Sequence, residues 1–109
     1  MNDAFKKFKN YRKIKTNING RGRYTLWVAD TSAKKSNGLS NISLLPRKHG
    51  MIFIYNDDVQ HSFTMKNTFI PLTIIFLDKD FNIIEAFKCK PHQKRSIVPS
   101  KKYRYVIEI

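Results

Sequence analysis

The side chains that acyl-transfer chemistry needs stand close together at one point of this sequence. Ser62 supplies a hydroxyl, His61 a base and Asp57 a carboxylate. Neighbouring residues of a β-strand point to opposite faces, so a strand here would separate the hydroxyl from the imidazole. The single cysteine, Cys89, is expected to be a buried apolar residue, because only neighbouring lysines could stabilise its thiolate. We therefore expect no catalytic residues and a protein that is not an enzyme.

Metal and cofactor sites are not indicated either. The histidines His49, His61 and His92 are scattered, without the i, i+4 spacing or the cysteine partners of a zinc site. The paired aspartates lie in turn-forming stretches, where aspartate is favoured for backbone reasons, and they lack the spacing of a calcium loop. The glycines of residues 19–22 do not have the spacing of a phosphate-binding loop. We expect neither a metal nor a cofactor.

A polar stretch before Pro71 is the candidate rim of a ligand site. Its residues are Met65, Lys66, Asn67 and Thr68. The lysine ammonium could bind a carboxylate or a phosphate, and the asparagine amide can bond backbone groups on both sides of a bend. Alternatively, Asn67 and Thr68 satisfy only the N–H and C=O groups of their own turn, and this is the interpretation that we favour.

Charge is the unusual property of the composition. The 109 residues include 21 lysines and arginines against 8 aspartates and glutamates, which gives a formal net charge of +13 and a pI near 10.1. An anionic partner, such as nucleic acid, an anionic membrane surface or an acidic protein, would explain why so much mutual repulsion is tolerated. The alternative is that a chain rich in Lys, Asn and Ile reflects an AT-rich genome.

The first 23 residues differ from the rest and are expected to form a basic arm. Phe5, Phe8, Tyr11 and Ile14 recur every third residue, a spacing that predicts one side of a short helix. A membrane-surface helix and an organellar transit peptide, which are also basic, remain open. The residues expected to bind a polyanion are Lys6, Lys7, Lys9, Arg12, Lys13, Lys15, Arg21, Arg23, Lys94, Arg95, Lys101, Lys102 and Arg104.

Residues 24–109 have the pattern of one small, mostly β domain with a single short helix. The expected strands are Tyr24–Ala29, Gly50–Tyr55, Ser62–Met65, Leu72–Leu77, Ile83–Lys88 and Tyr103–Ile109. The expected core includes Leu26, Val28, Phe53, Phe63, Ile75 and Val106. Thr31 would cap a helix that ends at Gly38, and residues 78–82 are typical of a hairpin turn. Strands this short and frequent favour a closed or nearly closed β-barrel, since closure removes exposed strand edges.

The sequence also bears on the compartment. No stretch approaches the ~20 consecutive apolar residues of a membrane-spanning helix, and the N-terminus lacks the apolar core of a secretion signal. One cysteine excludes an internal disulfide. We expect a soluble protein with no membrane span, located in the cytoplasm or within an assembled particle.

Several runs of residues resemble the family called domain of unknown function 192. The resemblance extends from Tyr24 to about Ile109, and it is most specific at Met65–Thr68 and Pro71-Leu72. The runs that carry it are Val28-Ala29-Asp30-Thr31, Gly38-Leu39, Gly50-Met51-Ile52-Phe53, Ser62–Thr68 and Ile70–Asp78. The resemblance implies a small β-barrel-like domain found in bacteria, archaea and some phages, with no established activity.

Three positions depart from what the resemblance implies. The family usually has Trp where this chain has Thr64, Asp where it has Thr73, and often Met where it has Ser40. Loss of the aromatic and the carboxylate puts an inherited ligand site in doubt. The family also commonly continues further, so the chain resembles a barrel trimmed at its C-terminus with an added basic N-terminal arm.

These observations together favour a binding and assembly module over an enzyme. In this hypothesis the barrel docks to protein neighbours while the basic residues engage nucleic acid or another polyanion inside a larger nucleoprotein particle, such as a virion or a ribosome-like body. The alternative is a β-barrel that binds a small ligand, for example a saccharide, at the rim formed by residues 65–68.

Overall fold

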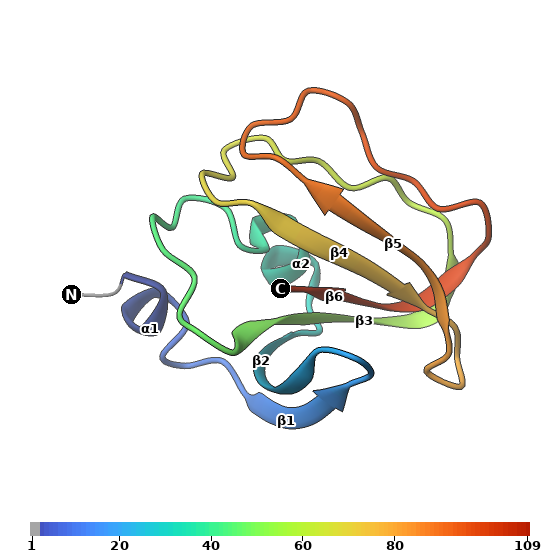
Figure 1. Cartoon of the computed structure of the whole chain (residues 1–109), viewed down its shortest axis with the longest axis horizontal. Helices are drawn as coiled ribbons and strands as arrows, with labels where there is room; N and C mark the ends of the chain where they lie inside the picture. The colour runs from blue at the N-terminus through green and yellow to red at the C-terminus, as the bar shows by residue number, and fades with distance from the viewer. Residues whose placement is uncertain (1–2) are drawn as a thin grey trace.

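Six β-strands form one sheet in the computed structural model, which describes residues 3–109 (Figure 1). The strands are β1 (Lys13–Ile18), β2 (Gly22–Ala29), β3 (His49–Val59), β4 (Leu72–Leu77), β5 (Ile83–Cys89) and β6 (Tyr103–Glu108). The helices are α1 (Asp3–Lys7) and α2 (Ser32–Asn37). The strand order is β1-β2-β3-β6-β4-β5, with β2 and β3 parallel and the other neighbours antiparallel. The mostly β fold that the sequence predicts is confirmed.

The sheet is barrel-like but not closed. No ladder of hydrogen bonds joins β1 to β5 within residues 3–109, so both are edge strands. A gap of about 360 Å³ between them is lined by Thr16 and Ile18 on one side and by Leu77 and Ile83 on the other. Complete closure, the stronger form of the expectation, is therefore wrong. The exposed lysines of β1 protect this edge instead, because charged side chains discourage pairing with another chain.

The central strands are buried on both faces, which explains their continuous apolar sequence. Successive residues of β3 and β4 alternate between two apolar clusters, one on each side of the sheet. The first cluster includes Trp27, Phe53, Phe76 and Val106, and the second includes Leu26, Val28, Ile52, Ile75 and Ile107. All the predicted core residues are buried except Phe63, which is half-buried against the first cluster.

The N-terminal segment differs most from the expectation. Helix α1 ends at Lys7, and Phe8 is completely buried in the first cluster. Strand β1 then pairs antiparallel with β2 along its whole length, from Lys13 opposite Trp27 to Ile18 opposite Gly22. The predicted helix through residue 14 is thus not observed, and residues 3–23 pack against or join the sheet rather than forming a separate arm; residues 1–2 of the predicted arm lie outside the described residues. The physical reason is the period of two over 13–18, where β-branched residues alternate with polar ones.

Local signals elsewhere are confirmed in detail. The Thr31 hydroxyl accepts a hydrogen bond from the Lys34 N–H at the start of α2, and Gly38 ends the helix with φ of 49°. In the β4–β5 turn, the Asp78 carboxylate accepts bonds from the N–H groups of residues 80 and 82.

The strand expected at Ser62–Met65 is reduced to a single bridge between Phe63 and Ile97.

Candidate functional site

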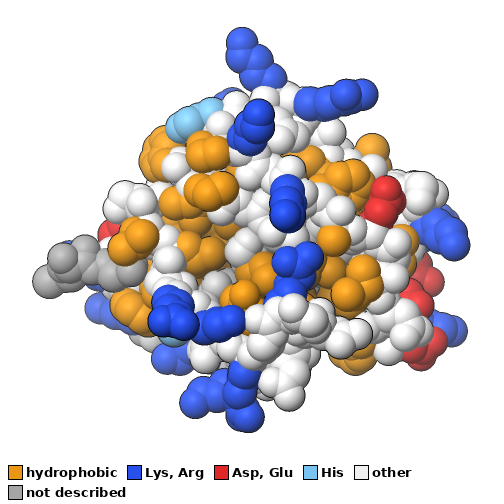
Figure 2. All heavy atoms as spheres, viewed as in Figure 1, with side chains coloured by type: hydrophobic (Ala, Val, Ile, Leu, Met, Phe, Trp, Pro, Cys, Tyr) orange, Lys and Arg blue, Asp and Glu red, His pale blue; other side chains and the backbone are white. Residues whose placement is uncertain are grey.

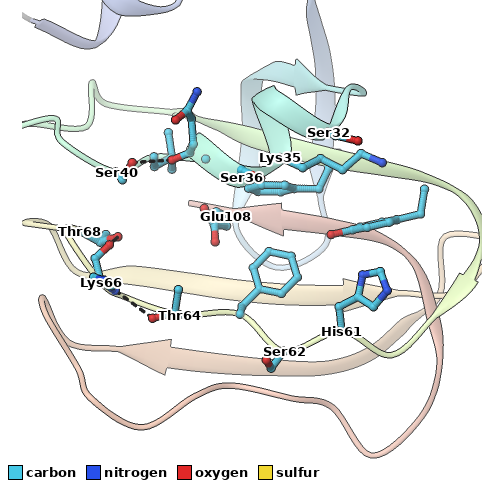
Figure 3. Close-up of a pocket in the computed structure, with 16 residues that line it drawn as sticks. Ser32, Lys35, Ser36, Ser40, His61, Ser62, Thr64, Lys66, Thr68 and Glu108 are labelled. Carbon is cyan, nitrogen blue, oxygen red and sulfur yellow. Dashed lines mark hydrogen bonds between the residues drawn. The ribbon is translucent and has the colours of Figure 1, made fainter.

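A pocket of about 440 Å³ lies between α2, strands β3 and β6, and the segment of residues 61–68 (Figure 3). Four parts of the chain that are distant in sequence meet here. They contribute residues 32–40, Phe53 and Tyr55, residues 61–68, and Glu108. The pocket is therefore a product of the tertiary fold rather than of a local motif.

The most unusual residue of the pocket is Glu108 at the end of β6. Its residue surface is only 5 % exposed. Within residues 3–109 no hydrogen bond or ion pair engages its carboxyl group, and its oxygens open onto the pocket, since no enclosed side-chain oxygen or nitrogen lacks a partner. Burial raises the pKa of Glu108 from 4.5 to about 8, so the group is mostly protonated at neutral pH. A protonated carboxyl can both donate and accept hydrogen bonds.

The sequence analysis missed Glu108, although a signal was present. Residues two apart in a strand share a face, and Val106 is among the residues correctly expected in the core. Glu108 therefore had to lie on the same buried face, where an unpaired acid is rare and points to function.

Serine and threonine side chains share the pocket with the carboxyl group, and the hydroxyls of Ser40, Thr64 and Thr68 bond to nearby backbone groups. Figure 3 shows Glu108 between α2 and the 61–68 segment, with Ser36, Ser40, Thr64 and Thr68 around the same space. A Cβ on residue 38 would lie 3.3 Å from the Phe53 ring, a tight contact, and 3.8 Å from a Glu108 carboxyl oxygen, an ordinary one, and the φ of 49° itself favours glycine. The glycine that ends α2 thus leaves room between the Phe53 ring and the carboxyl group.

Aromatic side chains supply the apolar part of the lining. Phe53 and Phe63 are in edge-to-face contact, with ring centroids 5.3 Å apart. The Lys35 ammonium lies 4.2 Å from the centroid of the Tyr55 ring, which holds this cation at the border of the pocket. Burial raises the pKa of Tyr55, so its hydroxyl remains protonated and can serve as a donor.

The predicted rim is only partly at this site. Lys66 and Thr68 line the pocket, whereas Met65 is fully buried in the core. Asn67 is exposed with φ of 56°, a left-handed conformation that asparagine tolerates well, and its backbone carbonyl accepts a hydrogen bond from the Asn41 N–H. The Thr68 hydroxyl donates to the Lys66 carbonyl. Residues 65–68 thus serve partly as a turn, through Asn67 and the Thr68 hydroxyl, and partly as pocket lining, through Lys66 and Thr68.

The residues considered for nucleophilic catalysis do not form a catalytic set. His61 and Ser62 both border the pocket, but their side chains extend in different directions in Figure 3, and no hydrogen bond joins them. Asp57 is exposed on β3 and is not part of the lining. In the part of the chain that the structure describes, no three His, Cys, Asp or Glu side chains could together hold a metal ion.

The predicted polyanion-binding residues are exposed except Arg104, but they do not form one patch. Strand β1 and its hairpin carry Lys13, Lys15, Arg21 and Arg23, while the connection from β5 to β6 carries Lys94, Arg95, Lys101 and Lys102. These two groups lie at opposite edges of the sheet, and Figure 2 shows basic side chains at both. Arg12 and Arg104 are paired with Asp30 and Asp58. Lys6, Lys7 and Lys9 lie on or just after α1, where the Lys7 ammonium donates to the Ser40 carbonyl.

The positions that depart from the resemblance fall on two sides of the sheet. Ser40 and Thr64 line the pocket. Thr73 does not, and its backbone instead exchanges hydrogen bonds with Ile109 at the end of the β4–β6 ladder. The missing aromatic and the missing carboxylate therefore do not belong to one site, and the carboxyl of the pocket comes from Glu108.

Comparison with known proteins gives a consistent result. The model of the family described as "Uncharacterized ACR" (DUF192) matches residues 14–109. A protein of unknown function from Novosphingobium aromaticivorans has a similar structure, with a TM-score of 0.78 and 28% identity over 91% of this chain and 72% of that one. A protein from Sinorhizobium meliloti described as a candidate transcription regulator has a TM-score of 0.81 and 26% identity over 91% of this chain and 81% of that one. No curated protein matches.

Neither helix of residues 3–109 is long and apolar enough to cross a membrane.

Proposed function

The chain belongs to the DUF192 family, and from this premise we propose that it binds a small ligand rich in hydroxyl groups, of the saccharide class, in the pocket around Glu108. The observation that carries the proposal is the Glu108 carboxyl group, which lies deep in the fold, opens onto the pocket and has no hydrogen-bond partner in the protein. Because the protein supplies no partner, only water or a ligand in the pocket can form a hydrogen bond with this group. A ligand hydroxyl that bonds to it would supply the missing partner.

The rest of the lining supports the same ligand class. Sugar rings have apolar faces and polar edges, and the pocket offers the Phe53 and Phe63 rings together with several hydroxyl groups. The ammonium groups of Lys35 and Lys66 at the border could form ion pairs with the carboxylate of an acidic sugar. Ligand pockets of this kind combine an apolar lining with a few polar groups that fix orientation.

The test is a titration of isotope-labelled protein with glucose, N-acetylglucosamine and maltotriose at millimolar concentrations, followed by NMR. Saturable shifts of the amides of Gly38, Thr64 and Glu108 are expected for at least one sugar, with small changes on β1. If none of these sugars moves the pocket amides, or if the shifts are spread over the whole chain, the proposal fails.

A variant that fills the pocket provides a second prediction. Ser36 is exposed at the border of the pocket, so Ser36→Trp should place a large ring in the ligand volume and weaken binding roughly tenfold or more. Its melting temperature should change little, because the position is not part of the core. Ser96→Trp, at an exposed position outside the pocket, is the matched control and should bind like the parent.

A further inference from the structure

A second surface, away from the pocket, is formed by one face of the β1–β2 hairpin. Lys13 and Lys15 of β1 lie opposite Trp27 and Thr25 of β2, and Arg23 lies opposite Asn17 on the same face. Along a strand, residues two apart are separated by about 6.6 Å. The two lysines and the arginine therefore make a short row of cations, which we call the hairpin row.

More positive charge lies at the end of the hairpin. The Lys48 ammonium donates a 2.9 Å hydrogen bond to the Arg21 carbonyl and lies 4.8 Å from the centroid of the Tyr24 ring. These contacts fix Lys48 beside the turn of residues 19–22. Arg47 precedes it and is exposed. Because successive strand residues point to opposite faces, Tyr24 and the Lys48 ammonium beside it lie on the face opposite Arg23. This second group of cations adjoins the end of the hairpin but does not extend the hairpin row.

Acidic side chains do not neutralise this surface. The ion pairs within residues 3–109 join Arg12 and Lys34 to Asp30, and Arg104 to Asp58. None of them involves the hairpin row. Asp3, the acid of α1, is engaged by the backbone and hydroxyl of Ser43. An unneutralised row of this kind attracts a polyanion.

An exposed aromatic ring adjoins the same face. Phe5 of α1 is 49 % exposed, although its ring centroid lies 6.1 Å from that of Trp27 and 5.1 Å from that of His49. Trp27 is the cross-strand neighbour of Lys13, so the ring and the hairpin row share one side of the sheet. Both contacts are T-shaped, and about half of the Phe5 surface remains open to solvent.

We propose that this face binds single-stranded nucleic acid, with the phosphates along the hairpin row and a base stacked on Phe5. Cations that follow a backbone beside an exposed aromatic ring are what sequence-tolerant single-strand binders use. A duplex keeps its bases stacked on each other and would offer none to the ring. An anionic membrane or an acidic protein would meet the same charge without needing the ring.

The test measures fluorescence anisotropy of a labelled oligothymidylate with the full chain over a range of salt concentrations. Three phosphate contacts predict a slope of log affinity against log salt of about −2, at roughly −0.7 per contact. The triple variant Lys13→Ala, Lys15→Ala, Arg23→Ala should lose most of this slope. The control triple variant Lys94→Ala, Arg95→Ala, Lys101→Ala removes the same amount of charge at the opposite edge and should keep it.

Phe5→Ala separates the single-strand proposal from simple charge attraction. Loss of one stacked base, worth ~1–3 kcal/mol, corresponds to roughly 5- to 150-fold weaker binding of the oligothymidylate. Binding of the corresponding duplex should be weaker and unchanged by this substitution. The proposal is overturned if both triple variants lose affinity equally, if Phe5→Ala has no effect, or if only phosphatidylserine vesicles or polyglutamate bind.

Discussion

Replacing Glu108 with glutamine should remove a pH dependence from the stability of the protein. The folded-state pKa of Glu108 is about 8, against 4.5 for the free side chain. Below pH 4.5 the carboxyl is protonated in both the folded protein and the unfolded chain, so its burial does not lower the free energy of unfolding through ionisation. Between the two pKa values the unfolded chain releases the proton while the folded protein keeps it, so stability falls as pH rises. Above pH 8 both states are ionised, and the loss levels off.

The expected size makes this one of the largest effects in the molecule. One unit of pKa shift corresponds to about 1.4 kcal/mol, so the difference between Glu108→Gln and the parent should grow by roughly 4 kcal/mol between pH 4.5 and pH 8. Urea unfolding at a series of pH values measures it. Asp80→Asn, which removes an exposed carboxyl, is the control. A difference that stays constant with pH would show that Glu108 is not buried in protonated form.

The same prediction bears on the ligand site. A ligand hydroxyl that donates to the Glu108 carboxylate would stabilise its charged form and lower the pKa of this group. A ligand that accepts a hydrogen bond from the protonated carboxyl would favour the neutral form. The pH dependence of sugar affinity, compared between the parent and Glu108→Gln, therefore shows whether the ligand donates a hydrogen bond to Glu108 or accepts one from it.

Elements that depend on local signals could be predicted from the sequence. Strand β4 begins after Pro71 and ends before the Asp78 turn, and the apolar run between them predicts the same bounds as observed. Helix α2 is predicted by Thr31 and Gly38, whose cap contacts are present. In these cases the residues that begin and end an element are adjacent to it in sequence.

Features that depend on distant contacts could not be predicted in the same way. Phe5, Phe8, Tyr11 and Ile14 are spaced like a helix face, but Phe8 fits a site in the core and Ile14 belongs to a strand. The alternation of residues 13–18 is a local sign of a strand, but nothing local reveals that this strand pairs with β2. The pocket is similar, because Glu108 meets α2 and residues 61–68 only after the sheet has formed.

Phe8→Ala should destabilise the protein by about 3–5 kcal/mol, the usual cost of removing a fully buried phenylalanine. The ring is 0 % exposed and lies 4.9 Å from the Trp27 ring and 5.0 Å from the Tyr11 ring, measured between centroids. Thermal or urea unfolding measures the loss. Phe5→Ala is the matched control, since this ring is half exposed and its loss should cost far less.

The comparison of these two variants decides how the N-terminal segment is held. If Phe8→Ala and Phe5→Ala leave stability equally unchanged, residues 3–18 are a loose arm, and the basic residues of β1 have no fixed positions. A large loss for Phe8→Ala alone means that the segment is part of the core. Lys13 and Lys15 are then held in place by the fold, and a polyanion that binds them meets a surface already arranged for it, without the entropy cost of ordering a flexible arm.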